Sequence, residues 1–387
     1  MKKIIFYIIS VFLFFNITSC DTADKKADAK TLSNKQIGQM KTQYTQLFRV
    51  SYYENYKKIS ILNPWEKGKI YHTYYLVSDS SFLQQNTDST SYIVNNIQRA
   101  ACLSADQIAA FDVLGINDKI AAVSQKKYIY NPHIQKAIEN KKIVELGDYQ
   151  TFNIEACLAA NLDAVFNTGW AQTQKTFQSL NKNNLPVIYY LAWQEQNPLG
   201  RAEWIKFIAA FFNKEEEAKQ YFAKIEREYT SIKEDLSKKI SKKVSVFNGN
   251  MMSGTWYVAG SKSYLAQLLK DAQANYLFSD NNKTGSVPLS FESVYLKAKD
   301  ADFWLPSVSV INNGEVLDAR CKDFKAYQKH HLYIYNHRIN KMGGNDYWES
   351  GSVHPEKILK DLANIFYPQL FDKDSLFYYQ QIKTLIR

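Results

Sequence analysis

The chain has 387 residues, of which 45% are hydrophobic, 14% aromatic and 22% charged, and 48 Lys and Arg outnumber 38 Asp and Glu to give a net charge of +10. This composition excludes a disordered polymer and a multi-span membrane protein. It provides enough apolar residues for two hydrophobic cores, because single cores stop growing near about 250–300 residues. The low content of 14 Gly and 8 Pro argues against a turn-rich all-β protein, and 27 Tyr, 22 Phe and 7 Trp exceed what two cores require.

The N-terminal residues have the pattern of an export signal. Lys2 and Lys3 precede the apolar run Ile4–Phe15, which is too short to span about 30 Å of hydrocarbon as a helix. The pattern predicts a signal peptide over residues 1–19. The residues that end at Cys20 resemble the bacterial lipobox, which implies a lipidated Cys20, a polar tether over 20–40 and a lipoprotein held on a membrane in the periplasm or at the cell surface. An ordinary signal peptide with a chance cysteine is the alternative.

The basic residues argue against a nucleic-acid site, and the remaining cysteines argue against a zinc site or a redox motif. Only seven of the basic residues are Arg, whereas nucleic-acid recognition favours the bidentate Arg side chain, so we expect no nucleic-acid partner. Cys102, Cys157 and Cys321 show no C-x-x-C spacing and no His at the spacing of a zinc site. We expect buried, apolar cysteines, and a Cys102–Cys157 disulfide remains open.

The part of the chain before residue 200 predicts a first lobe, over residues 41–200. β-like runs at 46–53 and 70–77 form a short leading β segment. From residue 99 onward, short apolar runs alternate with helical ones. Strands are predicted at 100–103, 120–124, 164–167 and 187–191, and helices at 105–114, 133–140 and 153–161. This alternation predicts βαβ units around a mostly parallel sheet.

A long amphipathic helix follows. Asn213 and Glu216 form a capping signal, and apolar residues then recur every three or four positions from Ala218 to Ile240. A helix over this range is roughly 34 Å long, which suits a connector between two globular lobes. We therefore expect connecting helices over 201–243, the alternative being one long helix within a single domain.

The rest of the chain, 244–387, predicts a second lobe of the same kind. Strands are expected at 244–248, 301–305 and 332–336, and helices at 263–269, 291–299, 324–329 and 355–366. Glu155 in the first lobe and Glu292 in the second each open a helical run that precedes an Asp-led apolar strand. The predicted fold class is α/β, with two lobes of mostly parallel sheets flanked by helices and joined by one long rigid helix.

Enzyme motifs are mostly absent. The sequence contains no G-x-G-x-x-G, no P-loop, no H-E-x-x-H and no G-x-S-x-G, and its six His show no convincing ligand spacing. We therefore expect a protein without catalytic residues, without a protein-bound metal ion and without an intrinsic cofactor.

Several ordered segments carry a family resemblance. Arg99–Ser104, Phe111–Gly115, Ile120–Val123, Gly147–Glu155 and Asn161–Val165 together resemble the substrate-binding proteins of ABC importers for iron-siderophore complexes, haem and cobalamin. Leu162 departs from the family pattern, which usually has Pro there. The resemblance covers about residues 95–370.

The resemblance implies a monomer with two lobes, one rigid connecting helix and one ligand in the cleft between the lobes. It also implies a permease and its ATPase as partners, with Glu155 and Glu292 pairing with permease arginines. The alternative role for both glutamates is stabilisation of a helix N-terminus through the macrodipole.

Ligand contacts are expected on the loops that follow the strands. These loops carry Ser104, Tyr128, Trp170, Trp193, Trp256, Tyr257, Arg338 and Trp348, with Arg201 nearby. Flat aromatic faces suit a small-molecule metal chelate such as haem, a corrinoid or a ferric siderophore. The scarcity of Arg argues against a heavily anionic chelate.

Three other functions compete with an importer component. A zinc or manganese carrier of the same fold requires His and carboxylates that converge on the cleft. A chelatase-like enzyme requires an acid–base pair, for which Glu195 and His354 are the only candidates. A surface lipoprotein that binds glycans would use the same aromatic residues on sugars.

Overall fold

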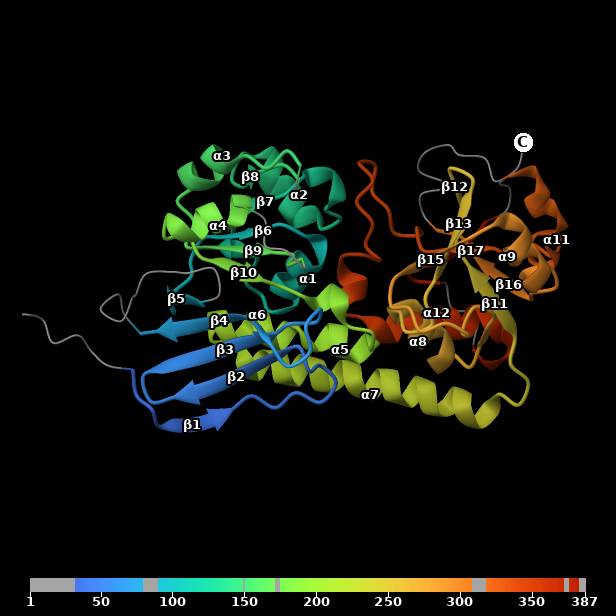
Figure 1. Cartoon of the computed structure of the whole chain (residues 1–387), viewed down its shortest axis with the longest axis horizontal. Coiled ribbons are helices and arrows are strands. Elements are labelled where there is room, and N and C mark those ends of the chain that lie inside the picture. Colours follow the sequence, from blue (N-terminus) through green and yellow to red (C-terminus); the bar gives the residue numbers. More distant parts are fainter. Residues whose placement is uncertain are drawn as a thin grey trace, which may run out of the picture.

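The computed structural model describes residues 32–78, 90–148, 150–170, 175–307, 318–371 and 376–382. The predicted signal peptide and Cys20 lie outside the described residues. Figure 1 shows two lobes next to each other along the long axis of the molecule, with helix α7 (Glu215–Lys239) extending under both. The predicted two-lobed α/β fold with one long connecting helix is therefore confirmed.

The first lobe is built on a parallel sheet with strand order β10-β9-β6-β7-β8. Its strands are β6 (Ala100–Cys102), β7 (Ile120–Val123), β8 (Val144–Glu145), β9 (Ala164–Asn167) and β10 (Val187–Tyr189). Helices α1 (Ala105–Val113), α2 (Pro132–Glu139), α3 (Ile154–Ala159) and α4 (Lys175–Lys182) connect them. All strands except the exposed β8 are fully buried, as expected for a parallel sheet that is covered on both faces.

Local signals fix the two ends of α1. The side-chain oxygen Oε1 of Gln107 accepts the backbone N–H of Ser104 at 3.2 Å, which caps the first turn. Gly115 follows the helix with φ +67°, a left-handed conformation that favours glycine. The strand β6 therefore leads directly into a helix whose N-terminus lies at the carboxyl edge of the sheet.

The leading segment is a complete sheet of five strands in chain order. It consists of β1 (Gln36–Gln39), β2 (Phe48–Tyr53), β3 (Tyr56–Leu62), β4 (Ile70–Val77) and β5 (Thr90–Val94), antiparallel except for the parallel pair β4–β5. It packs on α5 (Pro198–Glu203) and α6 (Ile205–Phe212): the ring of Phe48 contacts those of Trp204 and Phe207 at centroid distances of 5.0 and 5.4 Å. The leading segment thus shares a core with the first lobe.

Tyr74 of the leading sheet covers the open edge of the first-lobe sheet. Strand β10 is an edge strand, and the buried hydroxyl of Tyr74 donates to the carbonyl of Val187 at 3.1 Å and accepts the N–H of Tyr189 at 2.8 Å. One side chain therefore supplies the hydrogen bonds that a sixth strand would otherwise make.

Replacing Tyr74 by Phe should lower the free energy of unfolding by about 1–3 kcal/mol, because it leaves two buried backbone groups of β10 without a partner. Chemical denaturation measures the loss. Tyr257→Phe is the matched control, since this ring is exposed and its change should stay within about 0.5 kcal/mol. Equal stability of the two variants would show that the Tyr74 hydroxyl does not hold the edge.

Most described strands of the second lobe belong to two small sheets of three strands each. Strands β11 (Ser245–Asn248), β14 (Asn275–Tyr276) and β16 (Phe303–Leu305) form a parallel sheet, and β12 (Asn250–Met252), β13 (Thr255–Ala259) and β15 (Ser286–Leu289) an antiparallel one. Helices α8 (Tyr264–Asp271), α9 (Phe291–Ala298), α11 (Lys325–Gln328) and α12 (Pro355–Phe366) cover them. The strand predicted at 332–336 is only β17 (Tyr333–Ile334), which pairs with β18 (Gln380–Gln381).

Helix α7 has 25 residues and buries the apolar stripe that its sequence predicts. The Tyr44 hydroxyl of the leading segment donates to Glu226 on this helix at 2.7 Å. Further along, the Tyr229 hydroxyl of the helix donates to Asp271 of the second lobe at 2.7 Å. The helix therefore holds both halves of the molecule.

The three cysteines outside the predicted leader are buried and free, so the Cys102–Cys157 disulfide that remained open from the sequence does not form. Burial raises the pKa of the Cys157 thiol to about 11 and that of Cys321 to about 12. Within the described ranges, no helix is both long enough and apolar enough to cross a bilayer.

Candidate functional site

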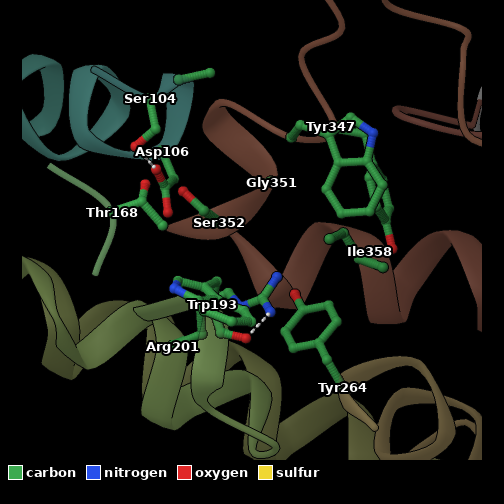
Figure 2. Close-up of a pocket in the computed structure, with 12 residues that line it drawn as sticks. Ser104, Asp106, Thr168, Trp193, Arg201, Tyr264, Tyr347, Gly351, Ser352 and Ile358 are labelled. Atoms are coloured by element: carbon green, nitrogen blue, oxygen red, sulfur yellow. Dashed lines mark hydrogen bonds between the residues drawn. The ribbon is translucent and has the colours of Figure 1, made fainter. Parts of the chain in front are cut away.

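A cavity of about 360 Å³ lies between the two lobes. Figure 2 shows side chains from both sides facing into it. The first lobe contributes Ser104, Ala105, Asp106, Thr168, Trp193 and Arg201, and the second contributes Tyr264, Tyr347, Trp348, Gly351, Ser352 and Ile358. The first-lobe residues follow the carboxyl ends of β6, β9 and β10, which is where ligands bind in parallel α/β sheets.

A polar corner of the cavity is formed by hydroxyl groups around one carboxylate. The Ser104 hydroxyl donates to Asp106, and Figure 2 shows Thr168 and Ser352 facing the same carboxylate. Burial raises the pKa of Asp106, while the Ser104 hydrogen bond and the charge of Arg201 act in the opposite direction. Such a corner suits hydrogen-bond donors on a ligand.

Arg201 and Tyr264 meet across the boundary between the lobes. The guanidinium carbon of Arg201 lies 4.0 Å from the centroid of the Tyr264 ring, in cation–π geometry. Its Nη2 donates to the carbonyl of Trp193 at 3.2 Å. Among the described residues, however, neither Nε of Arg201 nor the Tyr264 hydroxyl has a hydrogen-bond partner, although both atoms are buried.

Buried polar atoms are nearly always paired, so these two groups indicate a place for an acceptor that comes from outside the chain. Burial raises the pKa of Tyr264 to about 12, which keeps its hydroxyl protonated and able to donate at neutral pH. A ligand oxygen that accepts hydrogen bonds from both Arg201 and Tyr264 would therefore contact both lobes at once.

Aromatic rings form the remaining walls. Trp193 contacts Trp170 at a centroid distance of 5.1 Å on the first-lobe side. On the second-lobe side, the buried Tyr347 and the half-exposed Trp348 are perpendicular, with centroids 5.0 Å apart. Flat rings on both sides can hold a planar or partly apolar ligand.

A second cavity of about 200 Å³ adjoins the first one and shares Thr168 with it. It lies within the first lobe and is lined by Tyr128, Trp170, Phe152 and Asp148, among others. Of the ligand residues predicted from the sequence, Ser104, Trp193 and Trp348 thus line the interlobe cavity, and Tyr128 and Trp170 line its neighbour.

Three predicted ligand residues lie elsewhere. Trp256 is 0% exposed and packs against Trp304 in the core of the second lobe, because it faces inward from β13. Its neighbour Tyr257 faces outward from the same strand and lines neither cavity. Arg338 binds Asp346 at 2.5 Å and also lies outside the lining.

The acid–base pair considered for an enzyme is not in the cavity either. Glu195 is buried, where it binds the Thr45 hydroxyl and the indole N–H of Trp204. His354 contacts the Tyr221 hydroxyl at 2.9 Å and Glu356 at 2.8 Å. In the part of the chain that the structure describes, no three His, Cys, Asp or Glu side chains are grouped so as to hold a metal ion.

Glu155 and Glu292 occupy equivalent positions on the two lobes. Each is exposed and is the second residue of its helix, α3 or α9. The caps are also alike: the Asn153 side chain accepts the N–H of Ala156 at 2.9 Å, and the Ser290 side chain caps α9 in the same way. Glu292 additionally pairs with Arg320 at 3.1 Å, on the surface.

Comparison with known proteins identifies the family. The family model described as periplasmic binding protein matches residues 101–338. The chain belongs to the periplasmic binding protein family. This confirms the class that the sequence resembles, and the match includes the first-lobe sheet, α7 and most of the second lobe.

Individual proteins that resemble the chain are distant in sequence, and the solved structures among them are similar in fold. The chain is 26% identical over 353 residues to an uncharacterized lipoprotein of Methanocaldococcus jannaschii, which covers 85% of this chain and 82% of the relative. A periplasmic haem-binding protein of a Roseiflexus species, solved in apo form, superposes with a TM-score of 0.54 at 16% identity, covering 70% of this chain and 99% of that one. The periplasmic vitamin B12 binding protein of Vibrio cholerae gives 0.52 at 13% identity, covering 71% and 99%.

Proposed function

We propose that the protein is a lipid-anchored substrate-binding component of an ABC importer. It captures a metal chelate, namely haem, a corrinoid or a ferric siderophore, in the cavity between its lobes and delivers it to a permease with its ATPase. The observation that carries the proposal is the pair of buried polar groups of Arg201 and Tyr264 at the cavity, one from each lobe, which have no hydrogen-bond partner in the part of the chain that the structure describes.

The chemistry of the cavity supports this class of ligand. Arg201 and Tyr264 offer donors to an oxygen of the ligand, such as a carboxylate. Asp106 and the neighbouring hydroxyls accept or share hydrogen bonds at the opposite corner. Trp193 and Trp348 provide apolar faces. Two proteins of similar fold are described as binding haem and vitamin B12, and a relative described as a lipoprotein is consistent with an anchor at Cys20.

Titration of the purified chain with haem, cyanocobalamin and a ferric hydroxamate tests the ligand. Binding should quench tryptophan fluorescence, because Trp193 and Trp348 line the cavity. Arg201→Met should weaken the affinity roughly ten- to a hundredfold, as expected for a lost hydrogen bond from a charged donor. The control is Arg227→Met on α7, which lines no part of this cavity.

Quenching by none of the three compounds would reject the metal-chelate ligand. Equal affinity of the Arg201→Met and Arg227→Met variants would instead reject the assignment of this cavity as the site.

Glu155 and Glu292 are the proposed contacts to the permease. The two carboxylates are exposed on separate lobes. Charged pairs at the rim of an interface fix orientation and speed up association rather than supply most of the affinity. An exposed leucine lies one turn further along each helix, Leu158 on α3 and Leu296 on α9, which adds an apolar contact beside each charge.

A further inference from the structure

A loop of the second lobe forms hydrogen bonds with the first lobe next to the cavity. Residues 338–349, here called the clasp loop, contact residues 129–131, here called the clasp seat, which directly precede α2 of the first lobe. The contacts involve a carboxylate, an amide and a glycine, so they do not depend on one interaction alone.

Glu349 makes the central contact. Its carboxylate oxygens accept the backbone N–H of Tyr130 at 2.7 Å and that of Asn131 at 2.9 Å. Asn131 is the N-cap of α2, so the Glu349 carboxyl group lies at the N-terminus of that helix, where backbone N–H groups lack partners within the helix. The Glu349 residue is almost excluded from water, with 3% of its surface exposed.

Asn340 and Gly344 make the second contact. The Asn340 Nδ2 donates to the carbonyl of Ile129 at 2.8 Å, while its Oδ1 accepts the N–H of Met342 and Gly344 and so shapes the loop. A Cβ at Gly344 would lie 2.3 Å from the same Ile129 oxygen. The backbone of the clasp loop therefore approaches the first lobe as closely as only a glycine permits.

The clasp loop also carries part of the cavity wall. Tyr347 and Trp348 immediately precede Glu349 and line the cavity on the second-lobe side. Figure 2 shows Tyr347 on the second-lobe side of the cavity, near Ile358. Anchoring Glu349 to the first lobe thus fixes where these two aromatic rings stand.

We propose that Glu349 is a positioning residue: its two hydrogen bonds to the clasp seat hold the lobes closed and place Tyr347 and Trp348 at the cavity, and these bonds break when a ligand enters or leaves. The inference rests on the proposed function in taking the cavity as the ligand site. Its test uses the chain without ligand, so the two proposals fail independently.

The stability of the contact between the clasp loop and the clasp seat should depend on pH. Burial raises the pKa of Glu349 to about 8, the charges of Asp346 and Asp112 act in the same direction, and the two N–H bonds act against it. Arg338, which pairs with Asp346 and lies over the Tyr130 ring, is the cation on this side. In an open cleft the carboxyl is in water and has an ordinary pKa near about 4.3.

The closed form therefore binds a proton more tightly than the open form does. Closure takes up a proton between these two pKa values. The free energy of closure is therefore most favourable below the ordinary pKa and becomes less favourable as the pH rises toward about 8. Above that value it no longer changes with pH.

Amide hydrogen exchange of the full chain without ligand tests the proposal at single residues. In Glu349→Gln one of the two acceptor oxygens becomes an N–H₂ donor, so the clasp should open more often and the amides of Tyr130 and Asn131 should exchange about tenfold faster. The amides of His133 and Ile134 bind the Asn131 side chain within the same lobe, so they should keep their rates and serve as the internal reference.

Two further variants sharpen the test. Asn340→Asp keeps the acceptor that shapes the loop and replaces the donor to Ile129 by an oxygen that repels the Ile129 carbonyl. It should also speed up exchange at Tyr130, and it tests the clasp even where Glu349→Gln does not fold. Glu145→Gln is the matched control, because this carboxylate binds the N–H of Lys126 within one lobe, and it should leave the exchange of Tyr130 unchanged.

The pH profile separates a positioning role from a merely structural one. In the wild type, the protection of Tyr130 relative to His133 should fall between about pH 5 and 8, whereas in Glu349→Gln the ratio should be flat. The proposal is overturned by unchanged Tyr130 exchange in both Glu349→Gln and Asn340→Asp, or by a flat ratio in the wild type.

Discussion

Replacing Glu203 by Gln is expected to lower the free energy of unfolding by about 3–5 kcal/mol, as is typical when one partner of a buried ion pair is removed. Glu203 is 0% exposed and pairs with the buried Lys206 at 2.7 Å. Its carboxylate also accepts the backbone N–H groups of Gln43, Tyr44 and Thr45 at 2.8–3.1 Å. The neutral amide leaves the Lys206 charge buried and unpaired and brings an N–H₂ donor against these donors.

Chemical denaturation of the variant measures this loss. The matched control is Glu54→Gln, which removes an exposed ion pair with Lys35 and should change the stability by about 0.5 kcal/mol or less. The double variant Glu203→Gln with Lys206→Met should recover part of the loss, because the uncompensated charge is gone. A loss no larger than that of Glu54→Gln would show that Glu203 does not anchor the leading segment.

The double substitution Glu155→Ala with Glu292→Ala is expected to abolish coupling to the permease and to leave ligand affinity unchanged. Both carboxylates are exposed, and neither lines the interlobe cavity, so their removal affects only docking. Stimulation of ATP hydrolysis by the protein, measured with the permease and its ATPase in liposomes, should fall to the basal rate. Each single variant should retain part of the stimulation, because one lobe can still dock.

A double variant on another surface provides the control. Glu216→Ala with Glu217→Ala removes two exposed carboxylates from the first turn of α7, so the net charge changes by the same amount. This variant should stimulate ATP hydrolysis as the wild type does. If the Glu155 and Glu292 double variant also stimulates normally, these glutamates only stabilise their own helices.

The features that the sequence predicts correctly depend on local signals. The stripe from Ala218 to Ile240 is periodic over the whole of α7, and the strands β6, β7 and β9 are short apolar runs next to helix signals. Ser104 was predicted at the cavity for the same reason, because it follows a strand and begins a helix at the edge of a parallel sheet.

The features that were missed depend on contacts between distant parts of the chain. Asp106 follows Ser104 by two residues and could have been found from that spacing, whereas Tyr264 comes from a helix of the other lobe and has no local signal. Trp256 and Tyr257 were expected on a loop but lie on β13, where neighbouring side chains face opposite sides. Arg338 is expected from the sequence at the ligand but lies outside the cavity lining, because it pairs with Asp346, which comes near it only in the folded loop.

The Tyr74 hydroxyl at strand β10 has a consequence for how this protein can be shortened. The match to the family model begins at residue 101, which invites removal of everything before it. A chain trimmed to that point would lose Tyr74 and the sheet that carries it, and would leave the backbone of Val187 and Tyr189 open at the edge of a parallel sheet. Bare edges of this kind recruit further strands from other molecules, so a chain trimmed to the family match is expected to aggregate.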